Sequence, residues 1–171
     1  NPESRAWVAL KYRLHDRVIA ISEGIAQVLA AGGVPAQKLR VVRSSLDPLP
    51  WQQPATQAEF DAEFGLHEAR VRIGVVAQLI ERKGHRVLFD ALRRLPDRQG
   101  LRVVCFGQGP LREALERDAA DLGEVLRFAG FRKDLPRWVG ALDLLVHPAL
   151  MEGLGVSLLQ ASAAGVPIIA S

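Results

Sequence analysis

The feature that most constrains the fold is a regular alternation of short apolar runs and helical stretches through residues 71–171. The runs predict strands at 71–77, 101–106, 125–128, 144–146 and 166–170. Helices are predicted between them, at 84–95, from Pro110, after Asp134 and at 153–164. This alternation is typical of an α/β fold, a Rossmann-like parallel sheet with helices on both faces. Uninterrupted apolar runs fit strands that are covered on both sides.

The first part of the chain has a less regular pattern. An amphipathic helix is predicted at 3–14, where Trp7, Leu10 and Leu14 have helical spacing. A short buried strand is predicted at 17–21 and another short strand at 39–42, with a helix between them that Ser22 caps and Gly32-Gly33 ends. Prolines at 48, 50 and 54 predict a linker over 43–55. Thr56 and Glu59 form a capping box for a helix through Phe64.

Composition excludes several classes of protein. The 171 residues are 49% hydrophobic and 24% charged, which argues against disorder and allows one domain, or one domain with part of another. The net charge of +3 is scattered, and no basic run is interleaved with aromatic residues, so nucleic acid is not an expected partner. A solvated surface explains this charge, and an anionic ligand or an acidic membrane surface is the sharper alternative.

Cysteine use and apolar run lengths add further limits. Cys105 is the single cysteine, so the chain has no internal disulfide, and its apolar surroundings predict a core position. No apolar stretch reaches the ~18 residues that span a bilayer. The start, Asn1–Arg5, has no signal-peptide pattern and no Met, so we expect the chain to be a piece of a longer protein in the cytoplasm.

The segment after the fourth predicted strand carries the strongest chemical signal. Glu152 precedes Gly153-Leu154-Gly155, and these glycines open an apolar helix. Free backbone N–H groups and the positive end of a helix would bind an anion such as a diphosphate. Glu152 is a poor anion ligand and is better suited to accept hydrogen bonds from hydroxyls. A diphosphate beside hydroxyls indicates a nucleotide sugar.

Other candidates lie on loops that follow strands. In a parallel sheet the loops 78–83, 107–109, 130–133 and 148–155 share one edge, where ligands bind. Lys83, next to a helix start, would stabilise the charge of a leaving phosphate. Gly107 and Gly109 predict a tight turn near a ligand base or phosphate. They make a weak dinucleotide fingerprint, because Arg112 stands where a third glycine would fall.

Histidines and serines give no independent signal. His147 at a strand end could donate to a substrate or be structural, and His85 could cap or pack. No histidines and carboxylates have metal-ligand spacing, so we predict no metal site. Ser157 and Ser162 lie in a predicted helix without a Gly-x-Ser-x-Gly elbow, which argues against a serine hydrolase.

Taken in order, these motifs resemble the family-4 retaining glycosyltransferases, which have the GT-B fold of two Rossmann-like domains. The resemblance covers nearly the whole chain. The matching residues are Lys83-Gly84, Gly107-Gln108-Gly109-Pro110, Phe128-Ala129-Gly130 with Asp134, Asp143, Pro148, Glu152-Gly153-Leu154-Gly155 and Gly165-Val166-Pro167, with 16–22 and 41–47 resembling the crossover between domains.

The resemblance implies a domain organisation and a reaction. Residues 1–46 would be the tail end of an acceptor-binding N-terminal domain, 47–69 a linker with a short helix, and 70–171 an incomplete donor-binding domain. The reaction would transfer a sugar, with retention and without a metal or cofactor, from a nucleotide-diphosphate sugar to a hydroxyl of a glycan or a lipid-linked acceptor. The acceptor would be bound by the missing N-terminal domain, so the fragment alone would bind donor and be inactive. Peripheral contact with the inner face of the membrane is common in the family.

The resemblance also implies roles for site residues. Lys83 and Glu152 would be catalytic. The donor would be bound by Gln78, Arg82, Gly107, Gly109, Gly153, Leu154, Gly155 and Gln160. Many members have Arg at the place of Gln78, and here Arg82 could compensate; the family's second Glu is Gln160, which would hold the ribose with one amide oxygen. These departures favour one alternative, a non-catalytic nucleotide-sugar-binding subunit. A second alternative is a nucleotide-sugar epimerase of the same fold, which would need acidic and histidine groups from the missing half.

Overall fold

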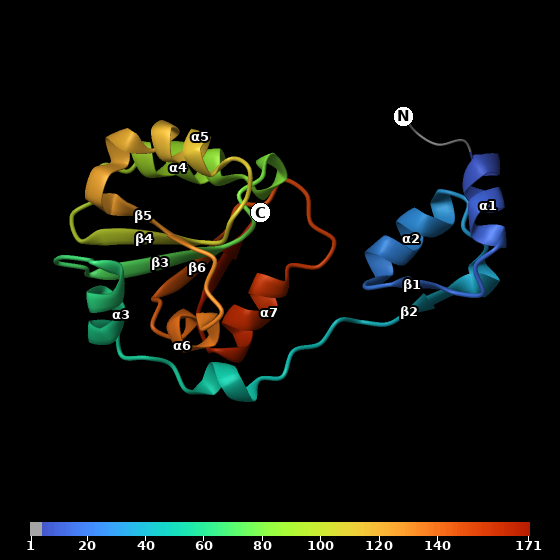
Figure 1. The fold of residues 1–171 in the computed structure, drawn as a ribbon, viewed down its shortest axis with the longest axis horizontal. Coiled ribbons are helices and arrows are strands. Elements are labelled where there is room, and N and C mark those ends of the chain that lie inside the picture. The colour runs from blue at the N-terminus through green and yellow to red at the C-terminus, as the bar shows by residue number, and fades with distance from the viewer. Residues whose placement is uncertain (1–4) are drawn as a thin grey trace. The chain divides into compact units, whose positions relative to one another are not determined.

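The computed structural model describes residues 5–171, which form two compact units (Figure 1). One unit contains the residues up to Ser45 together with Glu152–Gly155, and the other contains Leu46–Met151 and Val156–Ser171. The elements, in chain order, are α1 (Arg5–Arg13), β1 (Val18–Ala20), α2 (Glu23–Ala31), η1 (Ala36–Lys38), β2 (Leu39–Val41), η2 (Leu49–Gln52), α3 (Gln57–Phe64), β3 (Val71–Val76), η3 (Glu81–Lys83), α4 (His85–Arg93), β4 (Leu101–Phe106), α5 (Arg112–Asp118), η4 (Ala120–Val125), β5 (Leu126–Gly130), α6 (Leu135–Val139), β6 (Leu144–His147), α7 (Val156–Ala163) and β7 (Ile168–Ala170).

The first unit is built on a two-stranded parallel sheet, in which β1 pairs with β2. The predicted cap of α2 is confirmed, because the Ser22 hydroxyl accepts a hydrogen bond from the Ile25 N–H over 3.2 Å. The prediction of a buried strand at 17–21 is wrong in part: Ala20 is buried, but Ile19 is 63% exposed. Successive side chains of a strand point to opposite faces, and Ile19 lies on the other face from Ala20. The part of the predicted helix at residues 3 and 4 lies outside the described residues.

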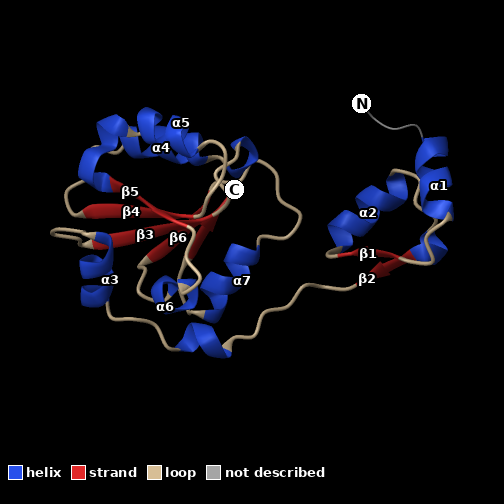
Figure 2. Cartoon of the chain, in the orientation of Figure 1, coloured by secondary structure: helices blue, strands red, loops and turns tan. Residues whose placement is uncertain are grey.

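The second unit is a five-stranded parallel sheet in the order β5-β4-β3-β6-β7, covered by helices on both faces. Helices α4 and α5 cover one face, and α3, α6 and α7 cover the other (Figures 1 and 2). This arrangement confirms the predicted α/β fold class. All five strands run in the same direction, so their carboxyl ends and the loops that follow them lie along one edge.

Two apolar clusters hold the helices of the second unit against its sheet. The cluster under α3, α6 and α7 centres on Phe60, Phe106 and Trp138, and the cluster under α4 and α5 on Phe89 and Leu115. Cys105 is buried in the second cluster, as predicted, and burial raises the pKa of its thiol to about 12. The thiol therefore stays protonated and unreactive at neutral pH.

The proline-containing segment before α3 packs on the second unit. Trp51 in η2 is only 5% exposed and belongs to the same apolar cluster as Phe60. The predicted capping box of α3 is present, with the Thr56 hydroxyl accepting from the Glu59 N–H and the Glu59 carboxylate accepting from the Thr56 N–H. Residues expected to be only a linker thus add an aromatic anchor to the core.

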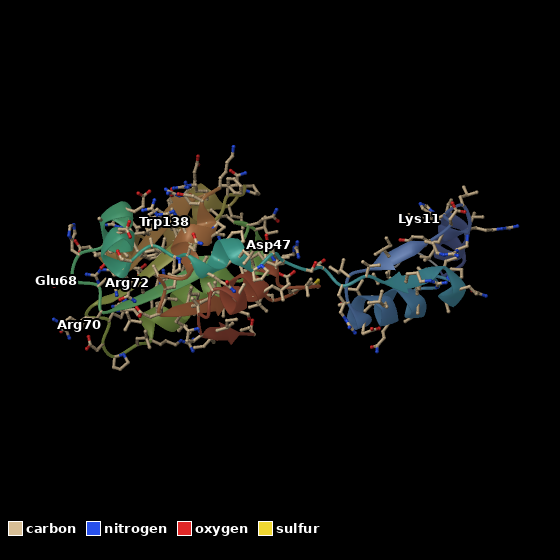
Figure 3. The ribbon with its side chains drawn as sticks, turned by 90° about the horizontal axis from the view of Figure 1, so that it is seen from below. Lys11, Asp47, Glu68, Arg70, Arg72 and Trp138 are labelled. Atoms are coloured by element: carbon tan, nitrogen blue, oxygen red, sulfur yellow. The ribbon has the colours of Figure 1, made fainter. Side chains whose placement is uncertain are left out.

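A buried arginine ties α3 to the amino end of the sheet, opposite to the loops discussed below. The Arg72 guanidinium donates to the Asp61 carboxylate over 2.7 Å, and Asp143 accepts from the Arg72 N–H over 2.8 Å. Figure 3 shows Arg72 near Arg70 and Glu68 at one end of this unit. The carboxylates of Asp61 and Asp143 raise the pKa of Arg72, chiefly through the hydrogen bond that Arg72 donates to Asp61. The network is structural, and it fixes the start of β3.

Helices α5 and α7 start later than predicted, and the expected cap of α6 does not form. Helix α5 begins at Arg112, two residues after the predicted start at Pro110. Helix α7 begins at Val156, three residues after the expected start at 153, so the glycines precede the helix. Glycine loses more backbone entropy on folding than other residues, which disfavours its place inside a helix. Asp134 precedes α6 but its side chain does not cap the helix amides. Its carboxylate instead accepts from Arg132 and from the Trp138 indole N–H over 2.8 Å.

Candidate nucleotide-sugar site

The turn that carries Lys83 joins β3 to α4 at the carboxyl edge of the sheet. Residues 81–83 form the 3-10 helix η3, Gly84 follows with φ +69°, and α4 starts at His85. The Leu150 N–H, after β6, donates to the Arg82 carbonyl over 2.9 Å. Lys83 therefore lies, half-buried, in a turn that is bonded to the segment leading to Glu152.

Gly84 allows this turn and the segment after β6 to pack without a gap. A Cβ atom at Gly84 would lie 1.7 Å from the Pro148 carbonyl oxygen. No side chain can occupy that space, and the positive φ also favours glycine. The Lys83-Gly84 pair thus combines a cation with a close approach of two backbone segments.

The glycines after β4 have the same role in a neighbouring turn. Gly107, at φ +139°, donates its N–H to the Gly130 carbonyl over 2.8 Å, and a Cβ on it would lie 1.9 Å from the Ala77 carbonyl oxygen. The Leu79 N–H donates to the Gln108 carbonyl over 3.0 Å. These bonds join the loops after β3, β4 and β5. Gln78 is exposed at this place.

The second unit therefore brings together Gln78, Arg82, Lys83, Gly107 and Gly109, which lie on adjoining turns of one sheet edge. The residues Glu152, Gly153, Leu154 and Gly155 group instead with the first unit. There the Gly153 N–H donates to the carboxylate of Glu152 over 3.1 Å. Gln160 lies half-buried on α7, in the second unit.

His85, the first residue of α4, is a buried imidazole that sequence patterns left undefined. It is 2% exposed, and neither ring nitrogen has a hydrogen-bond partner among the residues that the structure describes. Burial, and then the nearby charge of Lys83, lower its pKa from 6.5 to about 4. His85 is therefore neutral at physiological pH. A small pocket of about 30 Å³, open to solvent, adjoins it and is lined by Ile80, Glu81, Gly84, His85, Arg86, Val87, Leu111, Leu115 and Leu150.

The lowered pKa of His85 predicts an acid-sensitive fold. Between pH 6.5 and about 4 the unfolded chain binds a proton at this imidazole and the folded chain does not. Stability contributed by the neutral imidazole is therefore complete above pH 6.5 and is lost as the pH falls toward 4. His85→Leu should remove this loss, so that the variant gains about 2 to 3 kcal/mol over wild type at pH 4.5 relative to pH 7.5. Urea unfolding at both pH values measures the difference, and parallel pH profiles would contradict it.

A second histidine forms a buried pair that the sequence did not reveal. His147 ends β6, Ser157 is the second residue of α7, and the His147 Nδ1 atom lies 3.1 Å from the Ser157 hydroxyl oxygen. Both side chains are buried, with exposures of 4% and 5%. The nine residues between them, 148–156, give no periodicity from which such a contact could be predicted. The structure assigns His147 a structural bond to Ser157, one of the two roles left open for it.

An arginine clamp holds the loop after β5. The Arg132 guanidinium donates to the Glu63 carboxylate over 2.6 Å and to the Asp134 carboxylate over 2.7 Å. It also lies over the rings of Phe64 and Trp138, each at 5.5 Å from the ring centroid. The hydrogen bonds from Arg132 lower the pKa of Asp134 to about 2. Arg132 therefore ties the loop after β5 to α3 and α6.

Residues 5–171 contain neither a metal-binding cluster nor a membrane-spanning helix. No three histidine, cysteine, aspartate or glutamate side chains in this part of the chain are placed to hold a metal ion. None of its helices has the length and apolar character needed to cross a membrane.

Comparison with known proteins then decides the family. Residues 70–171 match the family model described as "Glycosyl transferases group 1". The chain belongs to this family. This group 1 chain is 32% identical over 173 aligned residues to the lipopolysaccharide core biosynthesis mannosyltransferase LpsB of Rhizobium meliloti, covering 96% of the chain and 48% of LpsB. It is 31% identical to the amylovoran biosynthesis glycosyltransferase AmsK of Erwinia amylovora, covering 84% of the chain and 36% of AmsK.

Solved structures show the same fold. Alr3699/HepE of Anabaena, in complex with UDP and glucose, superposes with a TM-score of 0.84 at 23% identity, covering 97% of this chain and 47% of HepE. The match to GT-B glycosyltransferases confirms the resemblance found in the sequence. The group 1 chain spans about half the length, or less, of these relatives.

Proposed function

We propose that this group 1 chain contains the donor-binding part of a retaining glycosyltransferase. The reaction would move a hexose from a nucleotide-diphosphate sugar to a hydroxyl of a glycan or a lipid-linked glycan. One observation carries the proposal: the Lys83-Gly84 turn is hydrogen-bonded and closely packed against the Pro148–Leu150 segment at the carboxyl edge of a parallel sheet. Nucleotides bind at this edge in open α/β folds.

The positive charge of Lys83 makes it the proposed ligand of the donor diphosphate. When the bond from the sugar to the diphosphate breaks, negative charge develops on the leaving phosphate oxygen. A fixed ammonium at that place stabilises the transition state more than the ground state, which is the condition for catalysis. Arg82 would add a second positive charge, and Gln78 a neutral donor. The N–H groups of Gly153, Leu154 and Gly155 would bind the phosphates ahead of α7.

Hydrogen-bond acceptors would bind the sugars. The Glu152 carboxylate accepts from hydroxyls and would orient the transferred hexose, while Gln160 would accept one ribose hydroxyl through its amide oxygen. The turn that contains Gly107 and Gly109 would lie beside the base or a phosphate. The leaving phosphate would take the acceptor's proton, so the scheme uses no base, metal or cofactor from this chain. Two similar proteins support a nucleotide sugar as the donor class. The HepE structure contains UDP and glucose, and a relative from Mycobacterium tuberculosis is named as a GDP-mannose-dependent mannosyltransferase.

Binding to the 171-residue chain tests the proposal. Isothermal titration with UDP and with GDP should give heat that fits one site, with a dissociation constant toward the upper end of the ~1 µM to 1 mM range common for substrates. No heat with either nucleotide, up to millimolar concentration, would reject it. Product analysis with the protein expressed from its complete reading frame distinguishes transfer from epimerisation: sugar joined to the acceptor in one case, free epimer without acceptor in the other.

Gln160 favours one alternative function, a nucleotide-sugar-binding subunit without catalytic activity. Nucleotide titration of a Gln160 variant tests the role of this residue in ribose binding. Gln160→Glu should bind UDP or GDP about 5- to 30-fold more tightly. A carboxylate accepts hydrogen bonds from both ribose hydroxyls through two charged oxygens, and this gain in binding free energy is about 1 to 2 kcal/mol. Wild-type turnover comparable to that of Gln160→Glu, measured with the complete protein, would exclude the non-catalytic alternative. Unchanged nucleotide affinity would instead remove Gln160 from the ribose site.

A further inference from the structure

We propose that the buried pair His147–Ser157 is a positioning device for the phosphate-binding start of α7. The inference rests on the proposed function, since it concerns the same site. His147 is the last residue of β6, the strand that precedes the loop 148–155, and Ser157 belongs to the first turn of the helix that follows this loop. The 3.1 Å bond between the two side chains therefore closes the loop at its base.

The strand side of this bond is fixed by other contacts. The Ser171 N–H, just after β7, donates to the His147 carbonyl over 3.2 Å, and the Ser171 hydroxyl donates to the Ala149 carbonyl over 3.0 Å. On the other side, Leu150 is bonded to the turn that carries Lys83. His147 is thus held by the sheet, and its ring is a fixed point for Ser157.

The helix side has fewer constraints. Glycines at 153 and 155 leave the backbone before α7 free to adopt many conformations, so the loop alone defines the helix start poorly. A buried hydrogen bond is short, directional and costly to leave unmade, whichever of the two groups donates. It therefore sets the position of the first turn of α7, and with it the amides that would face a diphosphate.

The pair acts through position and not by touching the ligand. Both side chains are almost fully buried, so neither competes with substrate for hydrogen bonds. Loss of the bond should therefore weaken nucleotide binding while the fold persists. A merely structural pair would lower the unfolding midpoint and leave the affinity of the folded chain unchanged.

Titration of UDP into the 171-residue chain, well below the unfolding temperature, tests the inference. Ser157→Ala should raise the dissociation constant of UDP about tenfold, a change of the size expected when a buried hydrogen bond loses one partner. The matched control is Ser162→Ala, an exposed serine on the same helix, which should bind UDP as wild type does. Ser157→Thr keeps the hydroxyl and should restore most of the affinity.

Variants of His147 keep the inference testable even if Ser157→Ala does not fold. The side-chain amide of Asn can occupy the place of Nδ1, whereas that of Gln extends toward the place of Nε2. His147→Asn should therefore bind UDP more tightly than His147→Gln. Equal UDP affinity in wild type and Ser157→Ala, or in the two His147 variants, would overturn the inference while leaving the proposed function intact. A wild-type chain that binds neither UDP nor GDP would reject the proposed function and the inference together.

Discussion

Lys83→Ala should lower kcat for sugar transfer about 100- to 1,000-fold, with a smaller effect on KM. The expected size is that of removing one preorganised group from developing negative charge. Lys83 lies half-buried in the turn before α4, and its charge is felt by His85, whose pKa it lowers in addition to the effect of burial. The ammonium therefore acts where the α4 amides already give a positive potential. Kinetics of the protein expressed from its complete reading frame, at saturating donor, measure the change.

A charge-matched control separates local from general electrostatics. Arg94 is exposed at the other end of the same helix, so Arg94→Ala removes one positive charge away from the proposed phosphate site. This variant should keep kcat within about twofold of wild type, since exposed charges beyond a Debye length are screened. Lys83→Arg should lie between wild type and Lys83→Ala, because the charge is kept but its geometry differs. If Lys83→Ala and Arg94→Ala had the same kcat, Lys83 would not stabilise the leaving group.

Gly84→Ala should destabilise the chain by about 3 kcal/mol or more and abolish nucleotide binding. Two costs add: a non-glycine residue at φ +69° costs about 1 to 2 kcal/mol, and the new Cβ would overlap the Pro148 carbonyl oxygen, 1.7 Å away. To remove this overlap, the turn that carries Lys83 and the Pro148–Leu150 segment must move apart. Separation breaks the hydrogen bond from Leu150 to Arg82 and moves both parts of the proposed site. Urea unfolding and UDP titration measure the two effects.

Gly165→Ala is the matched control for backbone strain. Gly165 has φ +72°, almost the same as Gly84, but a Cβ there would have no atom within 4 Å. It should therefore lose only about 1 to 2 kcal/mol of stability and keep UDP affinity. Equal losses in the two variants would show that φ strain alone explains Gly84, and that the close packing on Pro148 contributes nothing.

Much of the second unit could be predicted because its elements follow from local patterns. The run 101–106 forms β4 without a shift, and the capping box of Thr56 with Glu59 starts α3 where expected. Details at helix starts were predicted less accurately: α6 follows Asp134 as expected but without its side-chain cap, and α5 and α7 begin after their predicted starts. Asp134 bonds Arg132 and Trp138 in preference to the helix amides, and α7 starts only after the glycines.

Site residues show the same division. Lys83 and the glycines at 107 and 109 could be assigned to one sheet edge, because strand direction determines which loops lie together. The pairing of His147 with Ser157 and the burial of His85 could not, since a contact across an irregular loop leaves no period in the sequence.

The sequence by itself determined the succession of strands and helices along the chain, the carboxyl edge that would bind a ligand, and the family resemblance. These follow from apolar periodicity and from residue types at turns, which are properties of neighbours along the chain. Only the tertiary structure decided why Gly84 must be glycine and what His147 bonds. Gly84 is limited by Pro148, 64 residues later, and such exclusion depends on how two distant backbones pack and not on either local sequence.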